Sequence, residues 1–210
     1  TEKDLIDGKC ADHQTKPEVI KEENYFFRLS KYADVVAKKI ESGELEIVPE
    51  TRKNEVLSFI KQGVTDISFS RPSKSLSWGI PVPGDDSQTI YVWADALVNY
   101  LFPKEFWPAD VHVIGKDILR FHAILWPGML MAAQLPLPKT IFVHGFITVD
   151  GQKMSKTIGN VLEPAELVSK YGTDATRYYL LREISSLDDG DFSYEKFADR
   201  YTADLANGLG

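Results

Sequence analysis

Two lysines, Lys153 and Lys156, are the residues of this 210-residue chain whose type and spacing most clearly suggest chemistry. They flank a Met-Ser pair in the run Asp-Gly-Gln-Lys-Met-Ser-Lys-Thr (150–157), just after an apolar run, 141–149, that we predict to be a buried strand. A lysine ammonium carries three donors on a flexible stem, so it can hold a phosphate that moves during a reaction. A Lys-x-x-Lys spacing alone more often marks a solvated basic turn, and the neighbouring residues must therefore decide.

Those neighbours resemble a known family. Lys-Met-Ser-Lys-Thr is similar to the Lys-Met-Ser-Lys-Ser signature of class I aminoacyl-tRNA synthetases, and the threonine keeps the hydroxyl of the replaced serine. A His-Gly-Phe run lies upstream at the family's spacing. The resemblance implies that Lys153 and Lys156 hold the phosphates of ATP and that Ser155 also contacts the nucleotide. Lys153 and Lys156 are then the catalytic candidates, and Lys156 is the stronger of the two. It also places three residues near the adenine: His144, Gly145 and Phe146.

Two stretches with helical spacing carry aromatic side chains on one face. Trp93, Leu97 and Tyr100 recur at i, i+4 and i+7, and a second stripe at i, i+4 and i+8 consists of Ile118, His122 and Trp126. Such stripes usually face a hydrophobic core. His122, however, interrupts the second stripe where a core would favour leucine. Aromatic faces, aliphatic walls and one polar group are together what a pocket for a thioether requires.

The same stretches resemble the methionyl-tRNA synthetase family. The similar runs are Tyr-Val-Trp-x-Asp-Ala-Leu-x-x-Tyr (91–100), Ile-Gly-Lys-Asp-Ile-x-x-Phe-His-x-x-x-Trp-Pro (114–127) and Glu-Glu-Asn-Tyr-Phe-Phe-Arg-Leu-Ser-Lys-Tyr (22–32), and the similarity is collinear over essentially the whole chain. It implies that both stripes line a pocket for the methionine side chain, although some members have proline where Leu97 stands. It further implies that Gly115 and Asp117 lie near the adenosine ribose.

Cys10 and His13 have the spacing of half a zinc site. A closed tetrahedral site needs four ligands, and an unliganded surface pair is the more common meaning of two. The resemblance implies a structural Zn²⁺ whose two other ligands come from residues before Thr1.

Composition sets broad limits on the class of protein. Hydrophobic residues make up 43% and charged residues 26%, which is typical of a globular protein, and no apolar run approaches the ~20 residues of a membrane span. A single cysteine excludes an internal disulfide and favours a reducing, cytoplasmic location. The net charge of −7 argues against indiscriminate binding of nucleic acid, so an RNA partner would have to recognise a local, shaped surface.

Strands that alternate with helices predict an α/β fold with a parallel sheet, in which ligands bind at the carboxyl ends of the strands. We expect strands at 67–69, 90–93, 111–114, 141–143 and 146–149, and helices at 24–40, 52–62, 95–102, 117–133, 164–172, 173–182 and from about 194. By resemblance the sheet is the second half of a Rossmann-type class I synthetase fold. Four segments follow from this: 1–66, the end of a connective insertion; 67–150, the half-sheet; 151–190, the lysine loop and a helical tRNA stem-contact region; and 191–210, the start of a helical anticodon-binding domain.

The resemblance implies ATP-dependent activation of methionine, with Mg²⁺, followed by transfer of the methionyl group to tRNA. The family also requires a His-Ile-Gly-His element, and His112-Val-Ile-Gly115-Lys116 lacks its second histidine. We therefore expect the chain to be a partial enzyme, inactive alone, whose partners are methionine, tRNA and the amino-terminal part of the same protein. Two alternatives stay open: another class I synthetase, which the aromatic stripes disfavour, and a non-catalytic tRNA-binding fragment, which the intact lysines disfavour.

Overall fold

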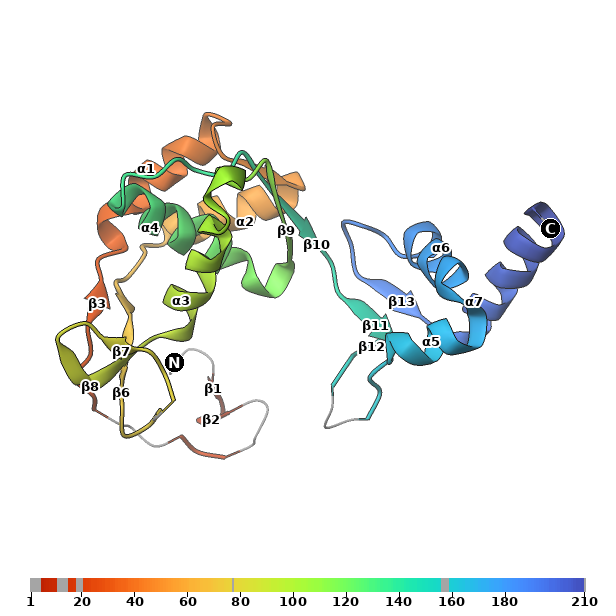
Figure 1. Cartoon of the computed structure of the whole chain (residues 1–210), viewed down its shortest axis with the longest axis horizontal. Helices are drawn as coiled ribbons and strands as arrows, with labels where there is room; N and C mark the ends of the chain where they lie inside the picture. The colour runs from red at the N-terminus through yellow and green to blue at the C-terminus, as the bar shows by residue number, and fades with distance from the viewer. Residues whose placement is uncertain (1–4, 11–14, 18–20, 77, 156–158, 210) are drawn as a thin grey trace. The chain divides into compact units, whose positions relative to one another are not determined.

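The computed structural model describes residues 5–10, 15–17, 21–76, 78–155 and 159–209 (Figure 1). The chain forms two compact units, one made of Thr1–Phe27 with Ile67–Asp95 and the other of Arg28–Asp66 with Ala96–Gly210. Across those described ranges, every helix is too short or too polar to cross a membrane. Each unit is described below on its own.

The first unit is built from short antiparallel strands. Its sheet has the order β6 (Ser70–Pro72), β8 (Asp85–Ile90), β7 (Pro81–Val82), while β3 (Phe26–Phe27) pairs with β5 (Ile67–Ser68) and β1 (Leu5–Ile6) with β2 (Lys9–Cys10). The buried Ser70 hydroxyl donates to Gln88 Oε1 at 2.6 Å and ties β6 to β8. The expectation that 67–69 and 90–93 are strands of a parallel sheet is wrong. β8 ends at Ile90, and helix α3 (Val92–Val98) follows because the amides of Ala94 and Asp95 donate to the carbonyl of Tyr91.

The second unit contains the predicted parallel sheet, which confirms the α/β fold. Its order is β4 (Glu46–Val48), β10 (Thr140–His144), β9 (Val111–Gly115), and Ile141 pairs with Ile47 on one side and with His112 on the other. Ile47 and Ile141 are buried in the core. Helices α1 (Ser30–Glu41), α2 (Glu50–Lys61) and α4 (Trp126–Ala132) lie around this sheet (Figure 1). We did not predict β4, because three residues between two helices are too few to show the alternation of polar and apolar side chains that marks a strand.

The first helix begins later than its apolar period suggested. Tyr25 and Phe26 continue the spacing backwards, but Phe26 belongs to β3 and α1 starts at Ser30. The carboxylate of Asp66 explains this start, since its Oδ1 accepts from the Ser30 amide at 3.1 Å and from the Ser30 hydroxyl at 2.6 Å. The same hydrogen bonds lower the pKa of Asp66. The cap comes from a residue far along the chain, and a local sequence pattern could not reveal it.

The helical stretch after β9 has an irregular course. It opens with the 3-10 helix η4 (Lys116–Ile118), passes through a π-helical turn, η5 (Phe121–Leu125), and continues as α4. Gly115 occupies the capping position and Asp117 lies within η4, so the helical stretch begins one residue earlier than the predicted start at 117. Two 3-10 turns, η2 (Asn99–Leu101) and η3 (Lys104–Phe106), precede β9. π-Helical turns inside helices are frequent at functional sites, and this one contains His122.

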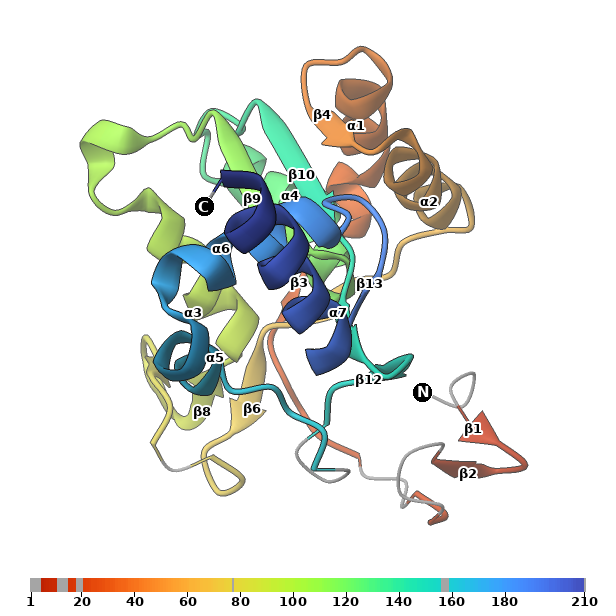
Figure 2. The ribbon, with the colours of Figure 1, turned by 90° about the vertical axis from the view of Figure 1, so that its right-hand side faces the viewer.

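The remaining elements form a second small sheet with helices beside it. The strand order is β12 (Gln152–Lys153), β11 (Ile147–Val149), β13 (Gly190–Phe192), so the apolar run 141–149 divides between two sheets and does not form one buried strand. Helices α5 (Pro164–Tyr171), α6 (Thr173–Glu183) and α7 (Tyr194–Arg200) begin where the sequence predicted. Figure 2 shows α7 running into the π-helical segment η6 (Tyr201–Leu209). Their common core consists of Leu167, Ala175, Tyr179, Phe192 and Phe197.

The compact units divide the chain differently from the four predicted segments. Residues 28–66 supply β4 to the parallel sheet, whereas residues 67–95 join the antiparallel unit. Proximity in sequence therefore does not define these units, because strand pairing joins segments that lie far apart in the chain. The assignment of the segments to an insertion, a stem-contact region and an anticodon-binding domain stays a prediction.

Candidate functional site

Five rings meet in the second unit beside the parallel sheet. They belong to Tyr100, Trp107, His112, His122 and Trp126, which we call the aromatic cluster. The ring centroid of Tyr100 lies 4.3 Å from that of His112, 5.6 Å from that of His122 and 6.2 Å from that of Trp126. The Trp107 ring lies 5.5 Å from the Trp126 ring in an edge-to-face arrangement, which is a favoured geometry for aromatic pairs. The structure therefore brings Tyr100, His122 and Trp126 together, as the two stripes predicted.

Hydrogen bonds fix the tautomer of His122. Its Nδ1 lies 2.9 Å from the carbonyl oxygen of Ile118, which can only accept, so Nδ1 carries the proton. Nε2 is then an acceptor and receives the hydroxyl proton of Tyr100 at 2.9 Å. Burial lowers the pKa of His122 and raises the pKa of Tyr100, so both groups are neutral at neutral pH. The cluster thus contains one internal O–H···N hydrogen bond and no net charge from this pair.

His112 and Trp107 are members of the cluster that the sequence did not identify as site residues. His112 is 5% exposed, and its Nε2 has no hydrogen-bond partner within the described ranges. Burial first, and the neighbouring His122 second, lower the pKa of His112 to about 4. The alternation of β9 was a usable signal, because His112 and the buried Ile114 share a face of the strand. Nothing comparable marks Trp107, which follows a short 3-10 turn without any period.

The other predicted pocket residues have different surroundings. Leu97 is buried, at 1% exposed, and Ile118 is half-buried and contributes the carbonyl that holds His122. Trp93 lies four residues before Leu97 on α3 and is half-buried within the first unit. The boundary between the two compact units falls between Trp93 and Leu97, so Trp93 is not counted in the aromatic cluster.

A second group of predicted residues meets at the carboxyl ends of β9 and β10. Gly115 pairs with His144 in the parallel register. A Cβ added at Gly115 would lie 2.8 Å from Asp117 Oδ1 and 3.6 Å from His144 Cε1, so the side chain of Asp117 would have to move to admit it. Gly145 is more tightly confined, because an added Cβ would lie 2.3 Å from the backbone of Asp188. In open α/β sheets, this end of the strands is where ligands bind.

Two ammonium groups lie close to the ring of Phe146. The Nζ atoms of Lys116 and Lys153 are 4.5 Å and 4.7 Å from the centroid of its ring, within the range of cation–π interactions. Lys116 also forms an ion pair with Asp189 at 2.6 Å. Lys153 is exposed at the end of the hairpin. The sequence identified Lys153 and Phe146, but neither Lys116 nor Asp189.

The hairpin that carries Lys153 is a two-residue turn. Asp150 and Gly151 have φ angles of 51° and 72°, the left-handed pair typical of a type I′ hairpin, and Thr148 pairs with Lys153 across it. The side chain of Asn160 closes the following loop, since its Oδ1 accepts from the Ser155 amide at 2.8 Å and its Nδ2 donates to the Lys153 carbonyl. Lys156 lies outside the described residues, so its role stays a prediction.

The zinc prediction is only partly accessible to the structure. Cys10 ends β2, whereas His13 lies outside the described residues. Where side chains are described, no three from His, Cys, Asp and Glu come together in a way that could hold a metal ion.

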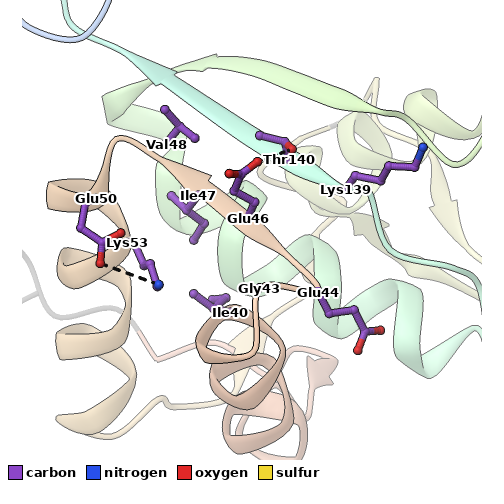
Figure 3. Close-up of a pocket in the computed structure, with 10 residues that line it drawn as sticks. All are labelled: Ile40, Gly43, Glu44, Glu46, Ile47, Val48, Glu50, Lys53, Lys139 and Thr140. Carbon is purple, nitrogen blue, oxygen red and sulfur yellow. Dashed lines mark hydrogen bonds and ion pairs between the residues drawn. The ribbon is translucent and has the colours of Figure 1, made fainter.

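A groove of about 620 Å³ lies near the opposite ends of the strands, where β4 and β10 begin (Figure 3). Its charged side chains have partners: Glu46 accepts from the Thr140 hydroxyl at 2.8 Å, and Lys53 pairs with Glu50 at 3.7 Å. Figure 3 shows Glu44 pointing away from the other acids. The acidic and basic side chains of this groove do not converge on one point where a ligand could bind, and we assign it no role.

The chain belongs to the class I tRNA synthetases: the family described as tRNA synthetases class I (M) matches residues 1–210. Curated relatives include methionine--tRNA ligases from Caldanaerobacter subterraneus and Clostridium acetobutylicum, which are 50% and 51% identical to the chain over its full length. The chain spans 34% of each of these two relatives. A solved structure of Mycobacterium tuberculosis methionyl-tRNA synthetase bound by methionyl-adenylate matches 98% of the chain with a TM-score of 0.88 and 44% identity, and the match spans 43% of that protein.

Proposed function

We propose that this chain provides the methionine-selecting and phosphate-binding part of a methionine–tRNA ligase. The observation that carries the proposal is the Tyr100–His122 hydrogen bond of 2.9 Å inside the aromatic cluster. A pocket for methionine needs apolar and aromatic walls that contact its thioether, together with a polar group that a leucine-like side chain cannot use. His122 and Trp126 are each 1% exposed and Tyr100 is 38% exposed, so Tyr100 is the member through which a ligand would first meet the cluster.

In the proposed reaction, a carboxylate oxygen of methionine attacks the α-phosphorus of ATP, and the bond to pyrophosphate breaks. The terminal hydroxyl of tRNA then attacks the methionyl carbonyl, and AMP leaves. This chemistry depends mainly on positioning and on stabilisation of phosphate charge. We assign nucleotide contacts to Gly115, Asp117, His144, Gly145 and Phe146, and phosphate contacts to Lys153, Ser155 and Lys156.

Mg²⁺ would accompany ATP, since it commonly binds through substrate phosphates. The exposed Asp117 beside Gly115 provides a carboxylate at the nucleotide end, which is compatible with such a partner. A structural Zn²⁺ at Cys10 and His13 would need two further ligands. We also propose tRNA as the second substrate, a cytoplasmic location, and a requirement for the rest of the ligase.

The test is a Tyr100→Phe substitution, which removes one hydroxyl and keeps the ring. The assay uses a chimaera in which this chain replaces the matching segment of the Clostridium acetobutylicum ligase. Loss of the hydroxyl removes the hydrogen bond that Tyr100 donates to the buried His122 Nε2, at a cost of about 1–3 kcal/mol. We expect kcat/KM for methionine in ATP–pyrophosphate exchange to fall on the order of tenfold, while the KM for ATP changes little.

Tyr25→Phe is the matched control. It also removes a hydroxyl, one that is bonded at 3.0 Å to Asp85 in the first unit, and it should leave the exchange rate unchanged. Equal methionine kinetics in Tyr100→Phe and the parent chimaera would show that the cluster does not select methionine. A parent chimaera that performs no methionine-dependent exchange would contradict the proposed function itself.

A further inference from the structure

Asp189 holds together two segments that the sequence places far apart. Both of its carboxylate oxygens accept from the Lys116 ammonium, at 2.6 and 2.7 Å, and its Oδ1 also accepts from the backbone amide of Phe146 at 2.8 Å. The next residue continues the contact, because the Gly190 amide donates to the Phe146 carbonyl at 2.9 Å. One acidic side chain at the entrance to β13 therefore fixes the end of β9 and the start of β11 at the same point.

These two segments contain the residues that we assign to the nucleotide. Lys116 stands between Gly115 and Asp117 in the chain, and Phe146 follows His144 and Gly145. The Phe146 ring is the surface against which both Lys116 and Lys153 rest. We infer that Asp189 is a positioning residue for ATP: it orients Lys116 and Phe146, and through Phe146 it places Lys153. This inference rests on the proposed function.

A contribution to fold stability is a weaker explanation of the same contacts. The side chains of Lys116 and Asp189 are 22% and 44% exposed, and partly exposed ion pairs stabilise proteins little because water screens them. The arrangement is nevertheless specific, since a single lysine bridges both oxygens while a backbone amide occupies one of them. The backbone of Gly145 also lies close to that of Asp188, since an added Cβ would be 2.3 Å from it. These features control position more than they control stability.

The aromatic cluster is not part of this arrangement. Among the residues that the structure describes, the side chain of Asp189 is hydrogen-bonded to Lys116 and to the Phe146 amide, and neither belongs to the cluster. Loss of Asp189 should therefore affect ATP and methionine differently, and a general weakening of the fold would affect both.

Two substitutions of Asp189 separate its two roles. Asp189→Asn keeps an oxygen that can accept from the Phe146 amide but removes the charge that holds Lys116. Asp189→Ala removes both. In the 210-residue chain, hydrogen exchange of the Phe146 amide should accelerate on the order of tenfold in Asp189→Ala, and much less in Asp189→Asn. The buried Val143 amide should exchange at the parent rate in both, which reports that the sheet is intact.

The kinetic test uses the chimaera described above. Both Asp189 variants lose the charge-assisted hydrogen bond to Lys116, so they should raise the KM for ATP on the order of tenfold. They should change the KM for methionine less than twofold. Lys116→Met should do the same, and Lys116→Arg should retain most of the parent value, because a guanidinium can bond a carboxylate through two donors. Asp110→Asn is the matched control, since it breaks another lysine–aspartate pair, with Lys139, ahead of β9.

The outcomes are distinct. Two results would overturn the inference: an unchanged rate of hydrogen exchange at the Phe146 amide in Asp189→Ala, or an unchanged KM for ATP in an active chimaera. Parallel increases in the KM values for ATP and methionine would also overturn it, because they indicate general damage. If the parent chimaera is inactive, the proposed function fails, while the exchange measurement on the chain still tests the positioning of Phe146.

Discussion

At the scale of the residue, the histidines of the aromatic cluster show how burial determines chemistry. His122 satisfies both ring nitrogens, through the Ile118 carbonyl and the Tyr100 hydroxyl. His112 is almost as deeply buried, yet its Nε2 has no partner among the described residues. A charged imidazole in such a place would be poorly solvated, and both histidines are therefore held neutral. Two neutral rings can line an apolar surface without the desolvation cost that a buried charge would carry.

The titration of His112 provides a prediction about stability. Its pKa is lowered from 6.5 to about 4 in the folded chain, so between these values the unfolded chain binds more protons and stability increases with pH. The contribution is complete above pH ~6.5 and is lost as the pH falls toward ~4. Between pH 7 and pH 5 we expect a loss of about 2 kcal/mol, to which His122 adds in the same direction.

Urea unfolding at these two pH values, followed by tryptophan fluorescence, measures this loss. His112→Phe should remove much of the pH dependence, and His144→Gln, which alters an exposed histidine, should retain it. An imidazole resonance of His112 that titrates near pH 6.5 in the folded chain would show that the ring is not held neutral by burial.

Residue types alone indicated more of this site than any measure of hydrophobicity could. His122 was identifiable because it is polar in an apolar stripe, and Lys153 because it lies in a motif. Asp189 and Lys116 were not identifiable, since these two partners lie 73 positions apart in the chain. A carboxylate in a polar, acidic stretch has no local feature that distinguishes a positioning role from simple solvation.

At the scale of the element, the helices and strands that were predicted correctly are those marked by residues within or next to the element itself. Helices α5 and α6 were predicted closely because Pro164 and Gly172 mark their ends, and Gly172 adopts a φ of 84°, which favours glycine. Strands β9 and β10 were predicted from their apolar runs. The stretch 90–93 was misassigned because β-branched and aromatic residues favour strands, whereas here a helix begins at Val92. β4 was missed because its pairing with β10 is entirely non-local.

Gly145 is the glycine on which the junction between β10 and β11 depends. An added Cβ would lie 2.3 Å from the Asp188 carbonyl carbon, and backbone cannot yield as a flexible side chain would. We expect Gly145→Ala to displace the 188–190 segment and to destabilise the chain by about 1–3 kcal/mol, as overpacking does.

Denaturant unfolding of the 210-residue chain measures this cost, and Gly208→Ala is its control. An added Cβ at Gly208 would have an ordinary contact of 3.5 Å with the Ala203 carbonyl oxygen, so this change should be neutral or slightly stabilising. Equal stabilities of the two variants would mean that the 188–190 segment moves freely, and that it does not anchor Phe146.

At the scale of the whole molecule, the parallel sheet is covered unevenly. Its order β4-β10-β9 places β9 at an edge of the described strands. His112 and Ile114 face the aromatic cluster and the core, whereas Val111 and Val113, on the other face, are 51% and 67% exposed. Parallel sheets in α/β proteins are normally buried on both faces. An exposed edge strand with an apolar face is a surface to which further chain is expected to bind.

The last prediction follows from that surface and from the share of its relatives that this chain spans, 34–42% for those compared. The chain contains the proposed methionine cluster and the lysine hairpin, but its sequence has no His-Ile-Gly-His element. We expect the purified chain alone to give no methionine-dependent ATP–pyrophosphate exchange. Exchange should appear when the remaining part of the Clostridium acetobutylicum ligase is added in trans. A Val113→Asp substitution, which places a charge on the exposed face of β9, should prevent that recovery.

Val161→Asp is the matched control, because it adds a charge at another partly exposed valine, outside the strands. Exchange from the chain alone would show that catalysis needs far less of the fold, and recovery that is indifferent to Val113→Asp would show that the missing part binds elsewhere.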